Sequence, residues 1–129
     1  MTHEFPIRVY YEDTDMAGIV YYANYLKYIE RARSDWVRSC GIDQNTLRDT
    51  DGVVFVVSRI EANYHAPARF DDVLTVKTTV LSASRVRLVM AQDIRRAAEK
   101  IFVAVVTLAC VDGDGRPVRL PADIRRTSE

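Results

Sequence analysis

The hydrophobic pattern changes its period once along the chain, and the change separates a helical part from β-rich parts. Phe5–Tyr11 alternates between apolar and polar positions, which predicts a strand. From Tyr22 the period becomes helical, and only Arg33 interrupts the apolar face. The residues of that face are Tyr22, Tyr25, Leu26, Ile29, Arg33, Trp36, Val37 and Cys40. With Gly41 as a C-terminal stop, the pattern predicts one long helix over Tyr22–Cys40.

The chain beyond Gly41 is predicted to be mainly β. Four segments rich in Val, Ile and Thr are long enough to be strands, and turn-forming residues separate them. They are Val53–His65, Val73–Ala83, Arg85–Arg96 and Lys100–Asp112. A sheet of this size must bury one face, and only one long helix is available to cover it. We therefore expect an α+β fold in which an antiparallel sheet of about five strands curls around that helix.

The bulk composition limits the function. The 129 residues are expected to form one domain, residues 1–129, with a single core. Eighteen basic and eighteen acidic residues balance, which argues against a nucleic-acid partner. Only three of the basic residues are Lys, and Arg holds phosphate and carboxylate better, although a GC-rich genome would produce the same bias. The chain shows no signal-peptide pattern, and its longest apolar stretch, Ile101–Val111, is too short for a bilayer, so we expect a cytoplasmic protein without a membrane span.

Residues that commonly bind metals or act as nucleophiles are scarce. Cys40 and Cys110 lie far apart and are expected to be reduced thiols. Of the two histidines, His3 falls in a terminus expected to be frayed and His65 in a turn. We therefore expect no bound metal and no cofactor. The chain also lacks a Gly-rich phosphate loop and a G-x-S-x-G nucleophile elbow, which excludes the common serine-hydrolase route.

Two carboxylates and a glycine stand where the predicted strand gives way to the helix. Gly18 permits a sharp turn after Asp13 and Asp15. A helix N-terminus presents unpaired N–H groups and a partial positive charge, which suit a carbonyl oxygen that becomes an oxyanion. Asp15, seven residues before Tyr22, would act on the carbonyl carbon or on a water beside it. Acids before a helix are also common caps, so spacing alone leaves both interpretations open.

The stretch YYEDTDMAGIVYYANYLKYIERAR, Tyr10–Arg33, closely resembles the signature of the 4-hydroxybenzoyl-CoA thioesterase family of the hotdog-fold superfamily. It is especially similar to bacterial acyl-CoA thioesterases associated with the Tol–Pal cell-envelope system. The resemblance continues through Pro67–Thr78 and Ala109–Pro121, and therefore covers nearly the whole chain. It implies a hotdog fold and an enzyme that hydrolyses acyl-CoA to a free acid and CoA without a metal or redox cofactor.

The resemblance also implies roles for single residues. Asp15 matches the catalytic carboxylate, which acts as nucleophile or general base, and Asp13 matches a residue that is usually present but is not the principal catalyst. The oxyanion donor is a backbone N–H that falls on Tyr22, and Gly18 forms the turn between the two. The Tol–Pal-associated relatives usually carry His where this chain has Tyr22. A backbone donor survives either side chain, so the substitution bears on acyl-chain preference, aliphatic or aromatic, more than on hydrolysis.

Substrate-binding residues are implied in the same way. Phe55 and Val56 lie on the strand that runs beside the thioester in the family. Arg85 matches a region that contacts the nucleotide of CoA, and Arg119 is a second candidate for its phosphates. Simple solvation at the surface is the alternative for both arginines.

Two other functions remain open from the sequence, and assembly is expected. A hotdog dehydratase would act on 3-hydroxyacyl thioesters, normally with a His beside a carboxylate. A non-catalytic module would bind acyl thioesters or an acyl carrier protein, which is also a possible carrier of the substrate. Five strands and one helix leave an open sheet edge and an uncovered face, so we expect a homodimer that pairs again into a homotetramer. The resemblance places two active sites at the subunit interface of such a dimer.

Overall fold

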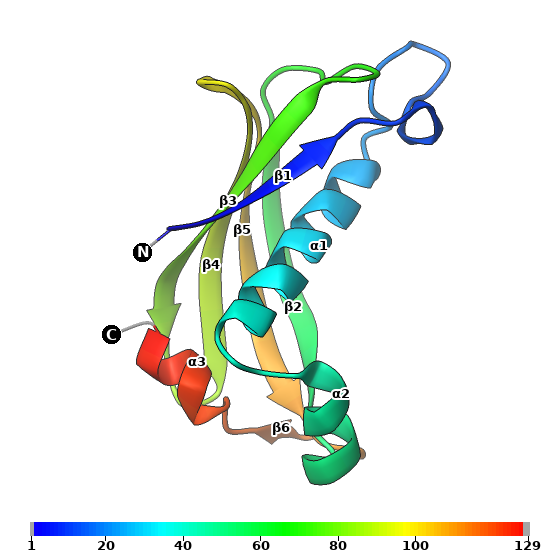
Figure 1. Ribbon diagram of the computed structural model, residues 1–129. Coiled ribbons are helices and arrows are strands. Elements are labelled where there is room, and N and C mark those ends of the chain that lie inside the picture. The colour runs from blue at the N-terminus through cyan, green and yellow to red at the C-terminus, as the bar shows by residue number, and fades with distance from the viewer. Residues whose placement is uncertain (1, 128–129) are drawn as a thin grey trace.

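A curved antiparallel sheet wraps around one long helix in the computed structural model, which describes residues 2–127 (Figure 1). The strands are β1 (Thr2–Arg8), β2 (Val54–Tyr64), β3 (Val73–Ala83), β4 (Arg87–Arg96), β5 (Glu99–Val111) and the short β6 (Pro117–Val118). The helices are α1 (Asn24–Ser39), α2 (Gln44–Thr46) and α3 (Ala122–Thr127), with a 3₁₀ turn at Tyr11–Asp13 and a π-helical turn at Leu47–Asp51. The predicted α+β architecture is confirmed.

The strand order is β1-β3-β4-β5-β2, and β6 pairs with β5. All pairs are antiparallel, so the register can be followed from one strand to the next. Thr78 of β3 lies opposite Gln92 of β4, and Gln92 lies opposite Ala104 of β5. The long strand β2 is left at one edge of the main sheet.

Alternate residues of the central strands face α1 and form the core. In β4 these are Leu88, Met90, Gln92 and Ile94, all fully buried, whereas the residues between them are more exposed. The buried face of α1 comprises Asn24, Tyr25, Tyr28, Ile29, Ala32, Trp36 and Val37. The predicted face was wrong at its borders, because Leu26 is 38% exposed while Tyr28 and Ala32 are buried. The small side chain of Ala32 allows the sheet to approach the helix, and Leu26 falls beside this line of contact.

Arg33, which interrupts the apolar face, belongs to a polar group between helix and sheet. Its Nη1 donates to Gln92 Oε1 over 3.0 Å. The buried Gln92 side chain in turn donates to the Ile29 carbonyl over 2.9 Å and to Thr78 Oγ1 over 3.0 Å. Burial lowers the pKa of the Arg33 guanidinium. These bonds fix α1 against β3 and β4 at one position.

The ends of several elements differ from their predicted bounds. The helix ends where Gly41 predicts, with Gly41 at φ +87, but it begins at Asn24 and not at Tyr22. The first strand ends earlier than expected, because the Tyr10 N–H donates to Asp13 Oδ2 over 2.8 Å and starts a 3₁₀ turn. The expected frayed terminus was wrong at His3, which lies in β1 with its Nε2 2.9 Å from Asp35 Oδ2.

The sequence did not indicate α2, β6 or α3, each six residues or shorter. Asp43 caps α2 by accepting the Thr46 N–H over 3.0 Å. These short elements lie together at one end of the sheet, and the start of α1 lies at the other (Figure 1). No helix within residues 2–127 is long and apolar enough to cross a membrane.

Candidate active site

Asp15 lies in a tight hairpin-like loop that leads into α1. Thr14 forms an antiparallel bridge with Val20, and the Asp15 N–H donates to the Ile19 carbonyl over 2.9 Å. The Gly18 N–H returns to the Asp15 carbonyl over 2.9 Å. Gly18 has φ +81, a conformation that strains other residues. The expected turn at Gly18 is therefore present and holds the backbone of Asp15 from both sides.

The Asp15 side chain is half-buried and partly engaged. Its Oδ1 accepts the Ala17 N–H over 2.9 Å, which fixes the direction of the carboxylate. Within residues 2–127 no group of the chain donates a hydrogen bond to its second oxygen, Oδ2. A carboxylate with one oxygen held and one available has the chemistry of a nucleophile or of a general base.

The chain enters α1 with unpaired backbone donors. The Tyr21 N–H donates to the Asp13 carbonyl over 2.9 Å, and the Asn24 N–H donates to the Tyr21 carbonyl over 2.8 Å. Between them, the hydrogen bonds of residues 2–127 include none donated by the N–H groups of Tyr22 and Ala23. The first turn of α1 contains no acidic residue. These donors lie at the positive end of the helix dipole and suit a carbonyl oxygen that gains charge.

Asp13 holds this arrangement together through its backbone and its side chain. Its carbonyl accepts both the Tyr21 N–H and the Asn24 Nδ2, the latter over 2.9 Å, while its Oδ2 accepts the Tyr10 N–H. Burial, together with the Asp13 carboxylate nearby, raises the pKa of the Tyr28 phenol. Asp13 is thus engaged in bonds that shape the loop.

Aromatic rings surround the start of α1. The Tyr64 hydroxyl donates to the Tyr22 carbonyl over 3.0 Å, so the last residue of β2 contacts the chain two residues before α1. Tyr22 and Tyr64 pack edge to face with centroids 6.4 Å apart, and Tyr25 stacks on Phe102 at 5.2 Å. Burial raises the pKa of both Tyr25 and Tyr64. Aromatic side chains therefore surround the unpaired donors, although Tyr22 itself is 62% exposed in the single chain.

The other predicted site residues lie at the opposite end of the sheet. Tyr64 pairs with Phe102 of β5, whereas Phe55 pairs with Cys110, about 26 Å further along at roughly 3.3 Å per residue. Arg85 and Arg119 are also at that far end, where the Leu120 N–H donates to the Arg85 carbonyl over 2.8 Å. Both arginines are exposed. The structure therefore brings Asp15, Gly18 and Tyr22 together in one chain and leaves the substrate-binding candidates apart from them.

Two hollows at the far half of the molecule are lined by three of these candidates, Phe55, Val56 and Arg119, whereas Arg85 lines neither. Phe55 and Val56 line a groove of about 200 Å³ between α1 and β2, together with Arg33 and Val37. Arg119 lines a second hollow of about 480 Å³ at the end of α1. Asp15 lines neither of the two. Within residues 2–127, no three His, Cys, Asp or Glu side chains are placed to hold a metal ion.

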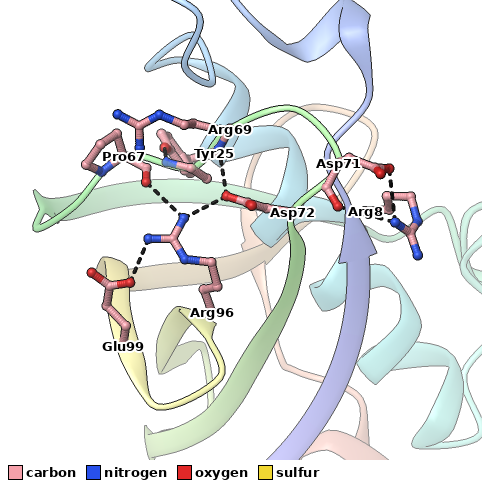
Figure 2. Close-up of polar contacts among 9 residues, drawn as sticks. Arg8, Tyr25, Pro67, Arg69, Asp71, Asp72, Arg96 and Glu99 are labelled. Atoms are coloured by element: carbon pink, nitrogen blue, oxygen red, sulfur yellow. Dashed lines mark hydrogen bonds and ion pairs between the residues drawn. The ribbon is translucent and has the colours of Figure 1, made fainter.

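The loop between β2 and β3 supports the start of α1, a contact that the turn and the resemblance seen there in the sequence did not indicate. The Val20 N–H donates to the Ala68 carbonyl over 2.8 Å, and the Ala68 N–H donates to the Tyr25 hydroxyl over 3.1 Å. Figure 2 shows the side chains that hold this loop, among them Asp72 and Arg96. The adjacent acids Asp71 and Asp72 are the feature of the sequence that could have indicated these contacts. Two neighbouring carboxylates at a partly buried turn are stabilised by hydrogen-bond donors or cations beside them. His65, at the start of the loop, is exposed and contributes a backbone bond to Ile101.

Comparison with known proteins finds a matching family and similar enzymes. The family described as the thioesterase superfamily matches residues 17–103. The acyl-CoA thioesterase YbgC of Haemophilus influenzae is 38% identical over 122 residues, which cover 94% of this chain and 90% of that protein. The acyl-CoA thioester hydrolase YbgC of Escherichia coli is 40% identical over 121 residues, covering 92% and 90%.

Solved structures agree with these relatives. The crystal structure of a probable thioesterase from Bartonella henselae has a TM-score of 0.90 and is 37% identical. The match covers 94% of this chain and all of that one. The likeness therefore extends over nearly the whole chain.

Proposed function

The chain belongs to the thioesterase superfamily and has its hotdog fold, and we propose that it is an acyl-CoA thioesterase that works through Asp15. One observation carries the proposal beyond family membership. The same loop presents a carboxylate with one unengaged oxygen and, seven residues later, an unpaired N–H at the start of α1. In thioester hydrolysis a carboxylate can act as nucleophile or base and an N–H donor can stabilise the oxyanion, and this loop supplies both groups.

In the proposed reaction the thioester oxygen lies against the Tyr22 N–H, which stabilises the charge as the carbonyl carbon becomes tetrahedral. As a nucleophile, Asp15 bonds to that carbon, the bond to sulfur breaks, and CoA leaves as a thiolate that takes a proton from water. Water then cleaves the acyl–Asp15 anhydride. As a general base, Asp15 takes a proton from a water that attacks the same carbon directly. The bond to sulfur then breaks, and the protonated Asp15 returns its proton to the departing CoA thiolate. Both routes give a free acid and CoA.

A homodimer completes the proposed site. The edge strand β2 is eleven residues long, and its apolar side chains are unusually exposed, Val57 at 43% and Tyr64 at 50%. A long apolar edge favours pairing with another strand. Antiparallel pairing with a second copy of β2 reverses the direction of that copy, which brings the partner's Phe55 and Val56 toward the Tyr64 end. The partner's Arg85 and Arg119 would then lie on the side of Asp15, where CoA phosphates need cations.

Pairing of dimers into a homotetramer and a cytoplasmic location remain parts of the proposal. Light scattering and activity across dilution test the assembly. We expect activity per chain to fall as the dimer dissociates. A monomer that retains full activity would contradict the shared site. Cell fractionation tests the location.

The two rival functions are separated by simple assays. A dehydratase would need a His at the start of α1, but His3 lies on β1 beside Asp35 and His65 lies between β2 and β3. Hydration of crotonyl-CoA without thiol release would support that rival. A binding module would bind acyl-CoA, or acyl carrier protein, and release no thiol even at high protein concentration.

The decisive experiment is thiol release from a panel of aliphatic and aromatic acyl-CoAs and acyl carrier proteins, with Asp15→Asn as the blank. We expect release from the wild type only, and the panel identifies the acyl group and carrier. Single turnover in oxygen-18 water separates the two routes. Oxygen-18 in Asp15 supports the nucleophile, because water that attacks the aspartyl carbon of the anhydride leaves its oxygen there. Water that attacks the acyl carbon leaves Asp15 unlabelled, so trapping of an acyl–Asp15 species is the second measurement, and neither label nor a trapped species supports the general base.

A further inference from the structure

The loop between β2 and β3 forms hydrogen bonds with residues on both sides of Tyr22 in the sequence. Ala68 is fully buried and accepts the Val20 N–H two residues before Tyr22. Its own N–H donates to the hydroxyl of Tyr25, in the first turn of α1. A bridge between Ile19 and Arg69 adds a third connection. The position of Ala68 therefore determines how the chain passes through Tyr22.

Arg96, at the end of β4, holds the loop on both sides of Ala68. Its Nη1 donates to the Pro67 carbonyl over 3.2 Å and to Asp72 Oδ2 over 2.6 Å (Figure 2). The same Asp72 oxygen accepts the Arg69 N–H over 2.8 Å. The Arg96 Nη2 is held by Glu99 over 2.6 Å, so the guanidinium is fixed from the sheet side as well. One planar cation thus ties the residue before Ala68 to the residue that ends the loop.

The environment keeps this pair ionised. Burial by itself would raise the pKa of Asp72, but the Arg69 N–H and the Arg96 guanidinium lower it below its ordinary value. Hydrogen bonds to Glu99 and Asp72 raise the pKa of Arg96. The side chains are only 25% and 30% exposed, so the pair is better shielded from salt than an exposed one.

A second pair holds the same turn from β1. Asp71 has φ +72, which is strained for a residue with a side chain. The Arg8 Nη1 donates to its Oδ1 over 3.0 Å and to its carbonyl over 3.2 Å (Figure 2). The Asp71 N–H also donates to the Val9 carbonyl over 2.8 Å. The turn is therefore held in a conformation that it would not prefer alone.

We propose that the Asp72–Arg96 pair is a positioning device for the reaction: it fixes Ala68, and through Ala68 it places the Tyr22 N–H that receives the thioester oxygen. This inference rests on the proposed function. Neither Asp72 nor Arg96 touches the substrate in this account. Their effect falls on the transition state, because a displaced oxyanion donor binds the ground state nearly as well.

The test uses Asp72→Ala, Arg96→Met and Arg96→Lys in the whole chain, with Asp93→Ala as the matched control. Alanine is chosen because an Asn oxygen could still accept the bonds from Arg69 and Arg96 that now go to Asp72 Oδ2. Asp93 pairs with Arg95 on the same strand, and these side chains are exposed to a similar degree, 26% and 27%. Two quantities are measured: kcat and KM for thiol release, and hydrogen exchange of the Val20 amide.

We expect kcat to fall at least about tenfold in Asp72→Ala and Arg96→Met, with KM within about twofold, since small misplacements of a catalytic group cost up to about 10²-fold. Arg96→Lys keeps the charge and recovers part of the rate. Val20 exchange becomes faster in the two disruptive variants, Asp72→Ala and Arg96→Met, and stays unchanged in Asp93→Ala.

Wild-type kcat in Asp72→Ala, or a lost kcat with unchanged Val20 exchange, would overturn the positioning role. A loss of rate that only follows the folded fraction, measured by thermal unfolding, would overturn it too. Absence of thiol release from the wild type would refute the proposed function instead. In that case the Val20 exchange still decides whether the pair holds this loop.

Discussion

The two ends of α1 differ in capping: the C-terminal end is capped, and the N-terminal end has no side-chain cap. At the C-terminal end the Cys40 N–H bonds to the Trp36 carbonyl over 3.1 Å, and the Gly41 N–H bonds to the Arg38 carbonyl over 3.0 Å. Gly41 takes the left-handed conformation typical of a helix stop, and Arg38 places a cation at the negative end of the dipole. At the N-terminal end Ala23 provides no side-chain cap, and the first turn has no acid.

The short helix α2 shows that this chain caps helices elsewhere. Asp43 precedes α2 and accepts the Thr46 N–H from its side chain. The longest helix of the protein lacks such a cap, although a cap is worth typically about 1 kcal/mol. We interpret the uncapped end as a site, where the N–H groups remain available for a substrate oxygen.

The uncapped N-terminal end of α1, called the open end below, is nevertheless fixed by hydrogen bonds to neighbouring segments. Asp13 bonds the Tyr21 N–H and the Asn24 side chain, and Ala68 bonds the Val20 N–H. None of these contacts uses the Tyr22 N–H. Donors that are fixed in place and unoccupied need no reorganisation during the reaction, which is what an oxyanion site requires.

The largest expected effect is that of Asp15→Asn. An amide is neither a base nor a nucleophile at neutral pH, so we expect kcat for thiol release to fall by about 10³-fold with little change in the melting temperature. The Asn side chain still accepts the Ala17 N–H, which preserves the loop. Asp114→Asn, at the far turn, is the control and should keep full activity. Wild-type rates in Asp15→Asn would remove Asp15 from the mechanism.

Tyr22→Pro is expected to have the next largest effect, because only proline removes a backbone N–H. Loss of one oxyanion donor costs about 10²–10³-fold in kcat in other enzymes, and we expect a loss in that range. Tyr22→His keeps the N–H and should hold kcat within a few-fold, while it alters the acyl-chain preference. Thermal unfolding shows whether the proline variant is folded. Equal kcat losses in both variants would assign the effect to the side chain.

Ala23→Asp places a carboxylate at the open end and separates stability from activity. The charge interacts favourably with the helix dipole, so we expect about 0.5 kcal/mol of added stability in denaturant unfolding. The added carboxylate would also accept hydrogen bonds from the N–H groups that the substrate oxygen needs, and its negative charge would repel the oxyanion. We therefore expect kcat to fall about tenfold. Ala23→Asn is the neutral control of similar shape. Greater stability with undiminished kcat would mean that this end does not meet the substrate.

Gly41→Ala tests the capped C-terminal end of α1 and has the smallest expected effect on catalysis. No atom lies within 4 Å of an added Cβ, so the cost comes only from the backbone at φ +87. We expect a loss of about 1 kcal/mol in the free energy of unfolding and an unchanged kcat per folded molecule. A comparable drop in kcat would show that the two ends of α1 are coupled in a way that their bonds do not explain.

Features set by neighbouring residues could be predicted from the sequence. The stop at Gly41, the strand Val73–Ala83 and the turn at Gly18 depend on a few adjacent residues, and all three are present as predicted. The start of α1 was placed too early, because the aromatic run at Tyr21 and Tyr22 continues the apolar period although the Asn24 N–H already turns back to Tyr21.

Features set by contacts between distant residues could not be predicted. The Asp72–Arg96 pair depends on the register of two strands, and His3 is ordered only because β1 pairs with β3 and Asp35 faces it from the helix. The borders of the helix face depend on the curvature of the sheet, which is why Leu26 is exposed and Ala32 is buried. The hairpin at Asp15 is local, whereas the loop that supports it comes from another part of the chain.

The central claim is that the open start of α1 receives the thioester oxygen, and the vibration of the bound carbonyl tests it most directly. In Asp15→Asn the substrate stays intact, so the stretching frequency of a ¹³C-labelled thioester carbonyl can be recorded on the protein. A donor at Tyr22 polarises the carbonyl, and we predict a frequency clearly below that of the same thioester in water, with the shift lost in Asp15→Asn combined with Tyr22→Pro. A bound thioester whose frequency matches that in water, or whose shift persists after Tyr22→Pro, would contradict the account.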